Sequence, residues 1–157
     1  MATVTVTSTV FDRQPVANVT GDITVSGQYN SGATDLSVAD VIFLAKIPHG
    51  ATVVEICVDH SNGETALGVD YGLATGGTAG GGASLSAFIS ALAISTVGRM
   101  TVRRAAGANP GGMVVSVSDA SPARYGIFAA YIASGTGTDS TIINFSITYR
   151  CDTQPNV

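Results

Sequence analysis

The chain has 157 residues, of which 45% are hydrophobic and only 11% are charged, and its formal net charge is −4 at pH 7. Soluble domains carry about a quarter charged residues, so this composition predicts a weakly polar surface that favours association with other protein chains. The acidic balance argues against nucleic acid as a partner, because phosphates are neutralised by clustered lysine and arginine and Lys46 is the only lysine.

Other classes of protein are disfavoured by the same composition. No apolar run approaches the ~20 residues that cross a bilayer, so we expect no membrane partner. The N-terminal residues lack the basic region and apolar stretch of a signal peptide, which predicts synthesis and residence in a cytoplasm. Residues 1–157 fit one domain with its own core. Cys57 and Cys151 are too few for a disulfide framework, and we expect free thiols, at least one of them buried.

The N-terminal residues are predicted to form the first strand. Thr3–Val10 alternates threonine or serine with mostly apolar partners, a period of two that is typical of strands. We expect this segment to be either an edge strand of its own sheet or an N-terminal arm, residues 1–10, that adds a strand to a neighbouring chain.

The next two strands have different patterns. In the first, apolar Ile23, Val25 and Tyr29 fall on one face, and the face between them carries polar residues. These polar residues are Thr24, Ser26 and Gln28. Asp40–Ile47 is apolar on both faces, which is typical of a central strand that is covered on two sides.

A turn at Pro48-His49-Gly50 ends that strand, since proline fixes φ and glycine closes the turn. Thr52–His60 resumes the strand pattern at once, so we expect the two strands to form a hairpin. Val54, Ile56 and Val58 share one face, and we assign that face to the core.

Strand signals continue to the end of the chain. Asn62-Gly63 is a strong turn signal, and the strand after it is marked by Leu67, Val69, Tyr71 and Leu73. Later strands are expected at Met100–Arg104, Met113–Ser118, Tyr125–Ala133 and Ser140–Arg150. The inward stripe of the last strand consists of Ile143, Phe145, Ile147 and Tyr149, continued by Cys151.

One segment departs from the strand pattern. Apolar residues at i, i+3, i+4 and i+7, which is helical spacing, are Leu85, Phe88, Ile89 and Leu92. We therefore expect Ala83–Ile94 to be a short helix or an irregular loop over one end of the sheets. The glycine-rich run 75–83 before it is expected to be a flexible loop that reaches a neighbouring subunit. It is not a phosphate-binding loop, because the required lysine is absent.

These signals together predict an all-β chain. The expected fold is a single antiparallel β-sandwich of jelly-roll type, with about eight strands and at most one short helix. Its core is expected to place Phe145 and Ile147 against the apolar face of Thr52–His60.

The group of residues that most resembles a catalytic site is Cys57, Asp59 and His60. A thiolate nucleophile needs a base within hydrogen-bonding reach, but Cys57 and His60 project to opposite faces of one strand. His49 is a remote alternative base across the turn. We assign no catalytic residue, and the chain is expected not to be an enzyme.

Metal binding has little support. Asp59, Ser61 and Asp70 are spaced loosely like a calcium loop, but Glu64 stands where such a loop requires glycine. A calcium site in a differently shaped loop is the alternative to a solvated loop. The two histidines and two cysteines lack zinc-ligand spacing. No metal ligand and no cofactor-binding residue is assigned.

A resemblance appears in residues 44–72. Leu44–Ala51 contains Ile-Pro-His-Gly-Ala, a strand follows at Val53–His60, and Gly68–Gly72 reads Gly-Val-Asp-Tyr-Gly. This run resembles the small head-associated structural proteins of tailed bacteriophages, which include capsid cement and decoration proteins. The resemblance implies a non-enzymatic homo-dimer or homo-trimer that binds the outer surface of the major capsid protein shell in the virion and bridges capsomers.

Two alternatives stay open. A carbohydrate-binding jelly-roll module of a phage fibre or spike would need aromatic residues gathered on an exposed face. The five tyrosines are candidates, but tryptophan is absent. The other alternative is a structural component of the tail or connector.

Overall fold

The computed structural model describes residues 5–10, 21–32, 35–48, 51–60, 67–74, 89–93, 98–103, 113–114, 125–136 and 141–150. This part of the chain contains ten strands and no helix. None of its elements is therefore a helix long and apolar enough to cross a membrane.

The strands vary widely in length. The long ones are β2 (Asp22–Asn30), β3 (Val41–Pro48), β4 (Thr52–His60), β5 (Gly68–Ala74), β9 (Tyr125–Ser134) and β10 (Ile142–Arg150). The shorter ones are β1 (Thr5–Thr7), β6 (Ile89–Ala93), β7 (Gly98–Arg103) and β8 (Met113–Val114).

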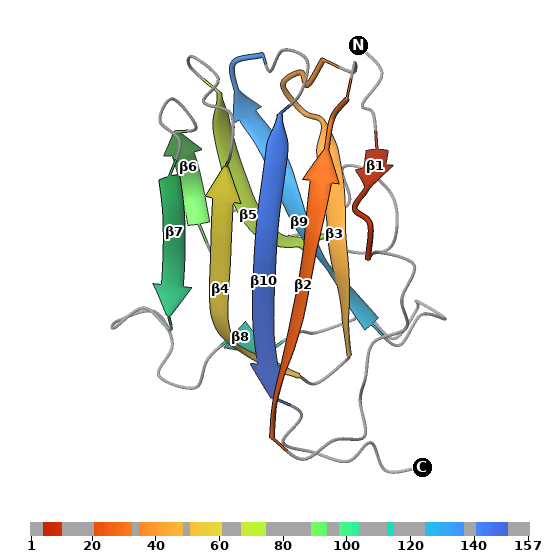
Figure 1. Ribbon diagram of the computed structural model, residues 1–157, viewed down its shortest axis with the longest axis vertical. Coiled ribbons are helices and arrows are strands. Elements are labelled where there is room, and N and C mark those ends of the chain that lie inside the picture. The colour runs from red at the N-terminus through yellow and green to blue at the C-terminus, as the bar shows by residue number, and fades with distance from the viewer. Residues whose placement is uncertain are drawn as a thin grey trace.

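The strands form two layers (Figure 1). Sheet A has the order β1-β3-β9-β5-β6, and sheet B has the order β2-β10-β4-β7 with β8 beside β4. Neighbouring strands are antiparallel except for β1, which runs parallel to β3. The predicted all-β sandwich is thus confirmed, with one parallel pair at its edge.

The predicted hairpin between the third and fourth strands is wrong. A turn does follow β3, where the amide of Ala51 donates to the carbonyl oxygen of Pro48 at 3.2 Å. The turn carries the chain from sheet A into sheet B instead of back along the same sheet. β3 is already paired with β1 and β9, and β4 with β10 and β7, so neither strand has a free edge for the other.

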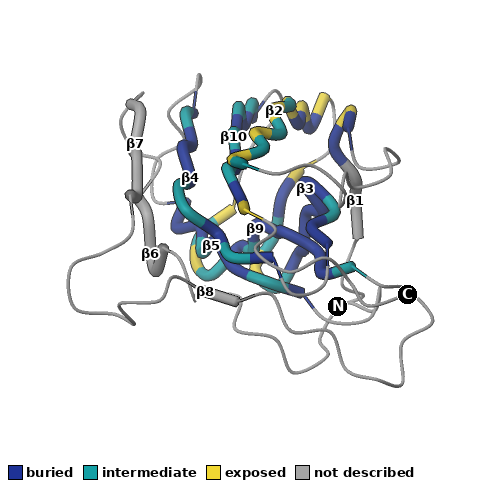
Figure 2. The backbone as a smooth tube through the Cα atoms, turned by 90° about the horizontal axis from the view of Figure 1, so that it is seen from below, coloured by how far each residue is buried: buried dark blue, intermediate teal, exposed yellow. Residues whose placement is uncertain are grey.

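The main core lies between the sheets, where buried residues of the two layers face one another (Figure 2). The predicted inward stripe of β10 is confirmed for Ile143, Phe145, Ile147 and Tyr149, all buried. On β2, Tyr29 is buried, and Ile23 and Val25 pack partly against the core. Cys151 lies outside the described residues.

The predicted inner face of β4 is right at Ile56 and Val58 and wrong at Val54. The register against β10 shifts between Thr148, which faces Glu55, and Tyr149, which faces Val53. A β-bulge of this kind inserts one extra residue and reverses the alternation beyond it. Val53 is therefore buried in the core, whereas Val54 is only half-buried.

The residues after β1 hydrogen-bond to both sheets. The amide of Ser8 donates to Phe43 O in sheet A at 2.9 Å, and the amide of Thr9 donates to Gln28 O in sheet B at 3.1 Å. Val10 then packs in the core against Gly27. The contact requires glycine at position 27, because a Cβ atom there would lie only 2.6 Å from Val10 Cγ2. In this structure the segment is an edge of its own sandwich, and its reach to neighbouring chains stays a prediction.

The expectation of a short helix or an irregular loop at Ala83–Ile94 is wrong for its described part. Ile89–Ala93 is strand β6, and it pairs antiparallel with β5 through Gly68 opposite Ala93 and Val69 opposite Leu92. β5 offers backbone hydrogen-bond partners at its edge, whereas a helix of this length is marginal without packing. Residues 75–88, including the glycine-rich run, lie outside the described part, and so do residues 115–118 of the predicted strand 113–118.

Candidate interaction surface

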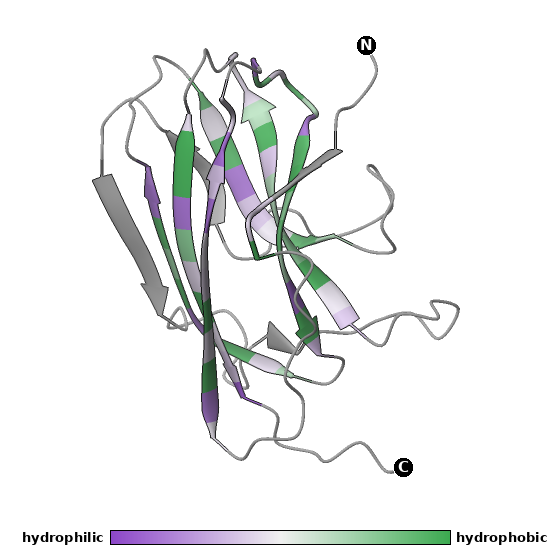
Figure 3. Cartoon of the chain, turned by 45° about the vertical axis from the view of Figure 1, so that its right-hand side comes forward, coloured by the Kyte–Doolittle hydropathy of each residue, from purple (hydrophilic) through white to green (hydrophobic). Residues whose placement is uncertain are grey.

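The outer face of sheet B carries a regular polar surface. Its residues on β2 are all exposed: Asp22, Thr24, Ser26, Gln28 and Asn30. The residues between them point into the sandwich, as the period of two requires. Figure 3 shows this alternation of hydrophilic and hydrophobic residues along the strands.

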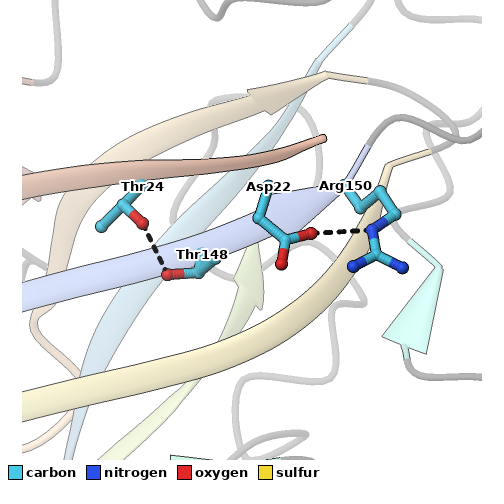
Figure 4. Close-up of polar contacts among 4 residues, drawn as sticks. All are labelled: Asp22, Thr24, Thr148 and Arg150. Carbon is cyan, nitrogen blue, oxygen red and sulfur yellow. Dashed lines mark hydrogen bonds and ion pairs between the residues drawn. The ribbon is translucent and has the colours of Figure 1, made fainter. Parts of the chain in front are cut away.

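Matched side chains on β10 pair with these residues across the strands (Figure 4). The hydroxyls of Thr24 and Thr148 are hydrogen-bonded at 2.8 Å, and Arg150 Nε lies 2.7 Å from Asp22 Oδ1. Farther along the same strands, Gln28 Nε2 donates to Asn144 Oδ1 at 2.8 Å. Such cross-strand pairs contribute roughly 0.2–1 kcal/mol each, so they favour one register, and Arg150 balances the charge of Asp22.

The outer face of sheet A is different. A second apolar cluster covers it, made of Val41, Phe43, Ala74, Ile127 and Ala129 with the half-buried Tyr125 and Tyr131. The ammonium group of Lys46 lies 5.1 Å from the centroid of the Tyr125 ring. β3 is therefore buried on both sides, as its sequence predicts. The solvent-facing sheet surface in the described part is that of sheet B.

β2 forms one edge of sheet B (Figure 1). The contact of Thr9 with Gln28 shows that the backbone groups of Gln28 point away from β10. Alternate residues of a strand direct these groups to the same side, so Asp22, Thr24 and Ser26 also present theirs outward. Within the described part of the chain, no backbone hydrogen bond reaches these three residues from that side.

The residues Cys57 and His60 are not brought together. Cys57 is a buried thiol outside any disulfide, and it alternates with inward-facing Ile56 and Val58. His60 points inward, where its Nε2 is hydrogen-bonded to the Tyr71 hydroxyl of sheet A. Their predicted placement on opposite faces is confirmed, and His49 lies outside the described residues.

Burial sets the protonation of this histidine–tyrosine pair. It lowers the pKa of His60 to about 4, against a smaller raising effect of Asp59, and it raises the pKa of Tyr71. Both groups are therefore neutral near pH 7. The pair joins the two sheets through a polar contact inside the core and provides no activated nucleophile.

The residues weighed for calcium also lie apart. Asp59 is on β4 in sheet B and Asp70 is on β5 in sheet A, whereas Ser61 and Glu64 fall outside the described residues. Among the described residues, no three histidine, cysteine, aspartate or glutamate side chains gather in a group suited to a metal ion.

The tyrosines do not form a sugar-stacking platform. Tyr29, Tyr71 and Tyr149 are buried in the main core, and Tyr125 and Tyr131 belong to the cluster on the other side of sheet A. The carbohydrate alternative thus loses the exposed aromatic face on which it depends.

The sequence interpretation missed the edge and the polar ladder of β2. Its alternation was visible, but its partner β10 lies more than a hundred residues farther along the chain, since Asp22 pairs with Arg150 and Asn30 with Ile142. A strand pattern shows which face is polar and does not show which strand lies beside it.

Comparison with known proteins yields structures and no sequence family. No family model and no curated protein matches the chain. A chain in the capsid of Ralstonia phage GP4 matches 96% of this chain over 100% of its own length, with a TM-score of 0.62 and 14% identity. A chain in the cyanophage Pam1 capsid asymmetric unit matches 88% of this chain over 94% of its own length, with a TM-score of 0.56 and 14% identity. The chain therefore shares its fold, nearly end to end, with chains from two bacteriophage capsids.

Proposed function

We propose that this protein is a non-enzymatic structural component of a bacteriophage virion. More specifically, we propose a cement or decoration protein that binds the outer surface of the major capsid protein shell and bridges neighbouring capsomers. The observation that carries this proposal is the match over nearly the whole length of chains from two phage capsids. The matched region spans nearly the whole of this chain and of both neighbours.

We also propose that the sandwich is a jelly roll. Eight strands form two four-stranded sets, with the orders β2-β10-β4-β7 and β3-β9-β5-β6. The chain crosses between the sheets at nearly every connection, which supports two Greek keys. β1 and β8 are additional to this set of eight, so the described part has ten strands where the sequence predicts about eight.

The surface chemistry suits a protein that functions by contact. Bridging capsomers requires area and unpaired strand edges and does not require a catalytic group. The polar outer face of sheet B and the edge of β2 provide such surfaces. The net charge of −4 suits a position outside the shell, where contact with packaged DNA is not needed.

The test is to measure the protein in purified virions and on shells that lack it. We expect a fixed copy number relative to the major capsid protein, saturable binding to bare shells, and a higher temperature of shell disruption after binding. A few copies that remain with isolated tails would instead identify a tail or connector component. Absence from virions together with no binding to shells would overturn the proposal.

A further inference from the structure

The edge of β2 lacks the features that keep sheet edges apart. Natural proteins protect such edges with lysine, proline, bulges or very short strands. β2 has nine residues and contains no lysine or proline, and its pairing with β10 runs from Asp22 to Asn30 without a register shift. Its one charged side chain, Asp22, is paired with Arg150 on its own sheet.

Only one end of this edge is occupied in the described structure. Thr9 binds it at Gln28, whereas the outward backbone groups of Asp22, Thr24 and Ser26 have no such neighbour among the described residues. The inward side chains Ile23 and Val25 remain only partly buried at the same place. A strand added along Asp22–Ser26 would pair the backbone groups and cover this apolar surface.

We propose that the added strand is β2 of a second copy of this chain, running antiparallel about a two-fold axis at Thr24. In that register Asp22 lies opposite Ser26 of the second copy, and Ile23 lies opposite Val25. No like charges meet, and two β-branched side chains face each other, which stabilises a strand pair. Three residue pairs exchange two backbone hydrogen bonds each, about six in all.

The choice of a second copy rests on this self-complementarity. A two-fold interface must present the same patch on both sides. Residues Asp22–Ser26 can meet their own copy in the antiparallel register without a like-charge pair. Since five paired residues bury less area than a standard interface, the dimer is weak in dilute solution. It is favoured where copies are held side by side on a surface.

The first experiment uses a cysteine placed on the axis. In a Cys151→Ser background, Thr24→Cys places two thiols on a residue pair with about 5.5 Å between Cα atoms, which a disulfide can span. We expect oxidation to give a covalent dimer on non-reducing gels. Thr148→Cys is the matched control, because Thr148 faces Thr24 on the same surface but lies on the internal strand β10. It is expected to stay monomeric under the same conditions.

The second experiment uses opposite charges. Thr24→Lys and Thr24→Glu each place like charges together at the axis. Each variant alone is therefore expected to lose the dimer that we expect for the wild type in sedimentation at high concentration. Their mixture is expected to restore a dimer that contains one copy of each. A mixture that stays monomeric, or single variants that dimerise like the wild type, would overturn the proposal.

The proposal stands apart from the capsid role, because it concerns pairs of this chain in solution. A wild type that is monomeric at every concentration would overturn the second copy as the partner. If the wild type were monomeric and Thr24→Lys also lost attachment to shells, the result would indicate that the edge of β2 binds a strand of another protein. A dimer without shell binding would leave the pairing intact and contradict the capsid role instead.

Discussion

Val53 and Val54 are neighbours of identical chemistry in different environments, because the bulge opposite Thr148 and Tyr149 turns Val53 into the core and Val54 away from it. Val53 is therefore expected to contribute more to the free energy of unfolding than Val54. Periodicity alone could not reveal this, since both residues fit a strand equally well.

The core of β4 can be tested by truncation. We expect Ile56→Ala, which empties a buried site, to lower the free energy of unfolding by roughly 2–5 kcal/mol. Val53→Ala is expected to cost more than Val54→Ala, and Glu55→Ala much less than Ile56→Ala. Urea denaturation of the four variants gives the order. A larger loss for Val54→Ala than for Val53→Ala would contradict the bulge.

His60 makes stability depend on pH. Its pKa is about 4 in the folded chain and about 6.5 when unfolded, so the unfolded state binds more protons between these values. The stabilisation is complete above about pH 6.5 and is lost as the pH falls through 4, by up to about 3 kcal/mol. His60→Gln should flatten this part of the pH profile of urea unfolding. An unchanged difference between pH 7 and pH 4 in the variant would show that other groups cause the loss.

At the scale of elements, the strands themselves were largely predictable and their partners were not. Alternation identified β2 and β10, and a run of apolar residues identified β3 as covered on both faces. The expectation of a short helix or irregular loop at Ala83–Ile94 failed for Ile89–Ala93, because local apolar spacing does not show that the edge of β5 lies beside this segment. The hairpin after β3 failed because turn residues do not specify whether the chain stays in one sheet.

The candidate surface was predictable only in part for the same reason. The polar face of β2 can be read from Thr24, Ser26 and Gln28, but the ladder depends on residues of β10 such as Thr148. The free edge depends on the order of all strands in sheet B. That order follows from packing between distant segments, which local patterns do not encode.

The N-terminal segment provides a test at this scale. Deletion of residues 2–10 removes the hydrogen bonds of Ser8 and Thr9 to both sheets and the buried side chain of Val10. We therefore expect a clear fall in the melting temperature, measured by circular dichroism. Val10→Ala alone should give a smaller fall, because a cavity remains while the backbone bonds persist. A preserved melting temperature with lost attachment or oligomerisation would instead identify residues 1–10 as an arm.

At the scale of the whole molecule, the chain combines few charges with two dissimilar sheet surfaces. Sheet A is covered by apolar residues on both faces, whereas sheet B presents a polar face. A low surface charge weakens the repulsion that keeps proteins apart. We interpret this as the property of a protein that is stable when assembled with others, and this interpretation agrees with the proposed role.

The position of β10 has a consequence for synthesis. It lies between β2 and β4 in sheet B, yet every other strand of the described part precedes it in the chain. A ribosome therefore releases β2 and β4 long before the strand that joins them, and both keep open edges in the meantime. Contacts of such long sequence separation slow folding, and exposed edges favour aggregation during that delay. We expect chains truncated before Ile142 to remain unfolded, and full-length chains to refold in milliseconds to seconds in stopped-flow experiments.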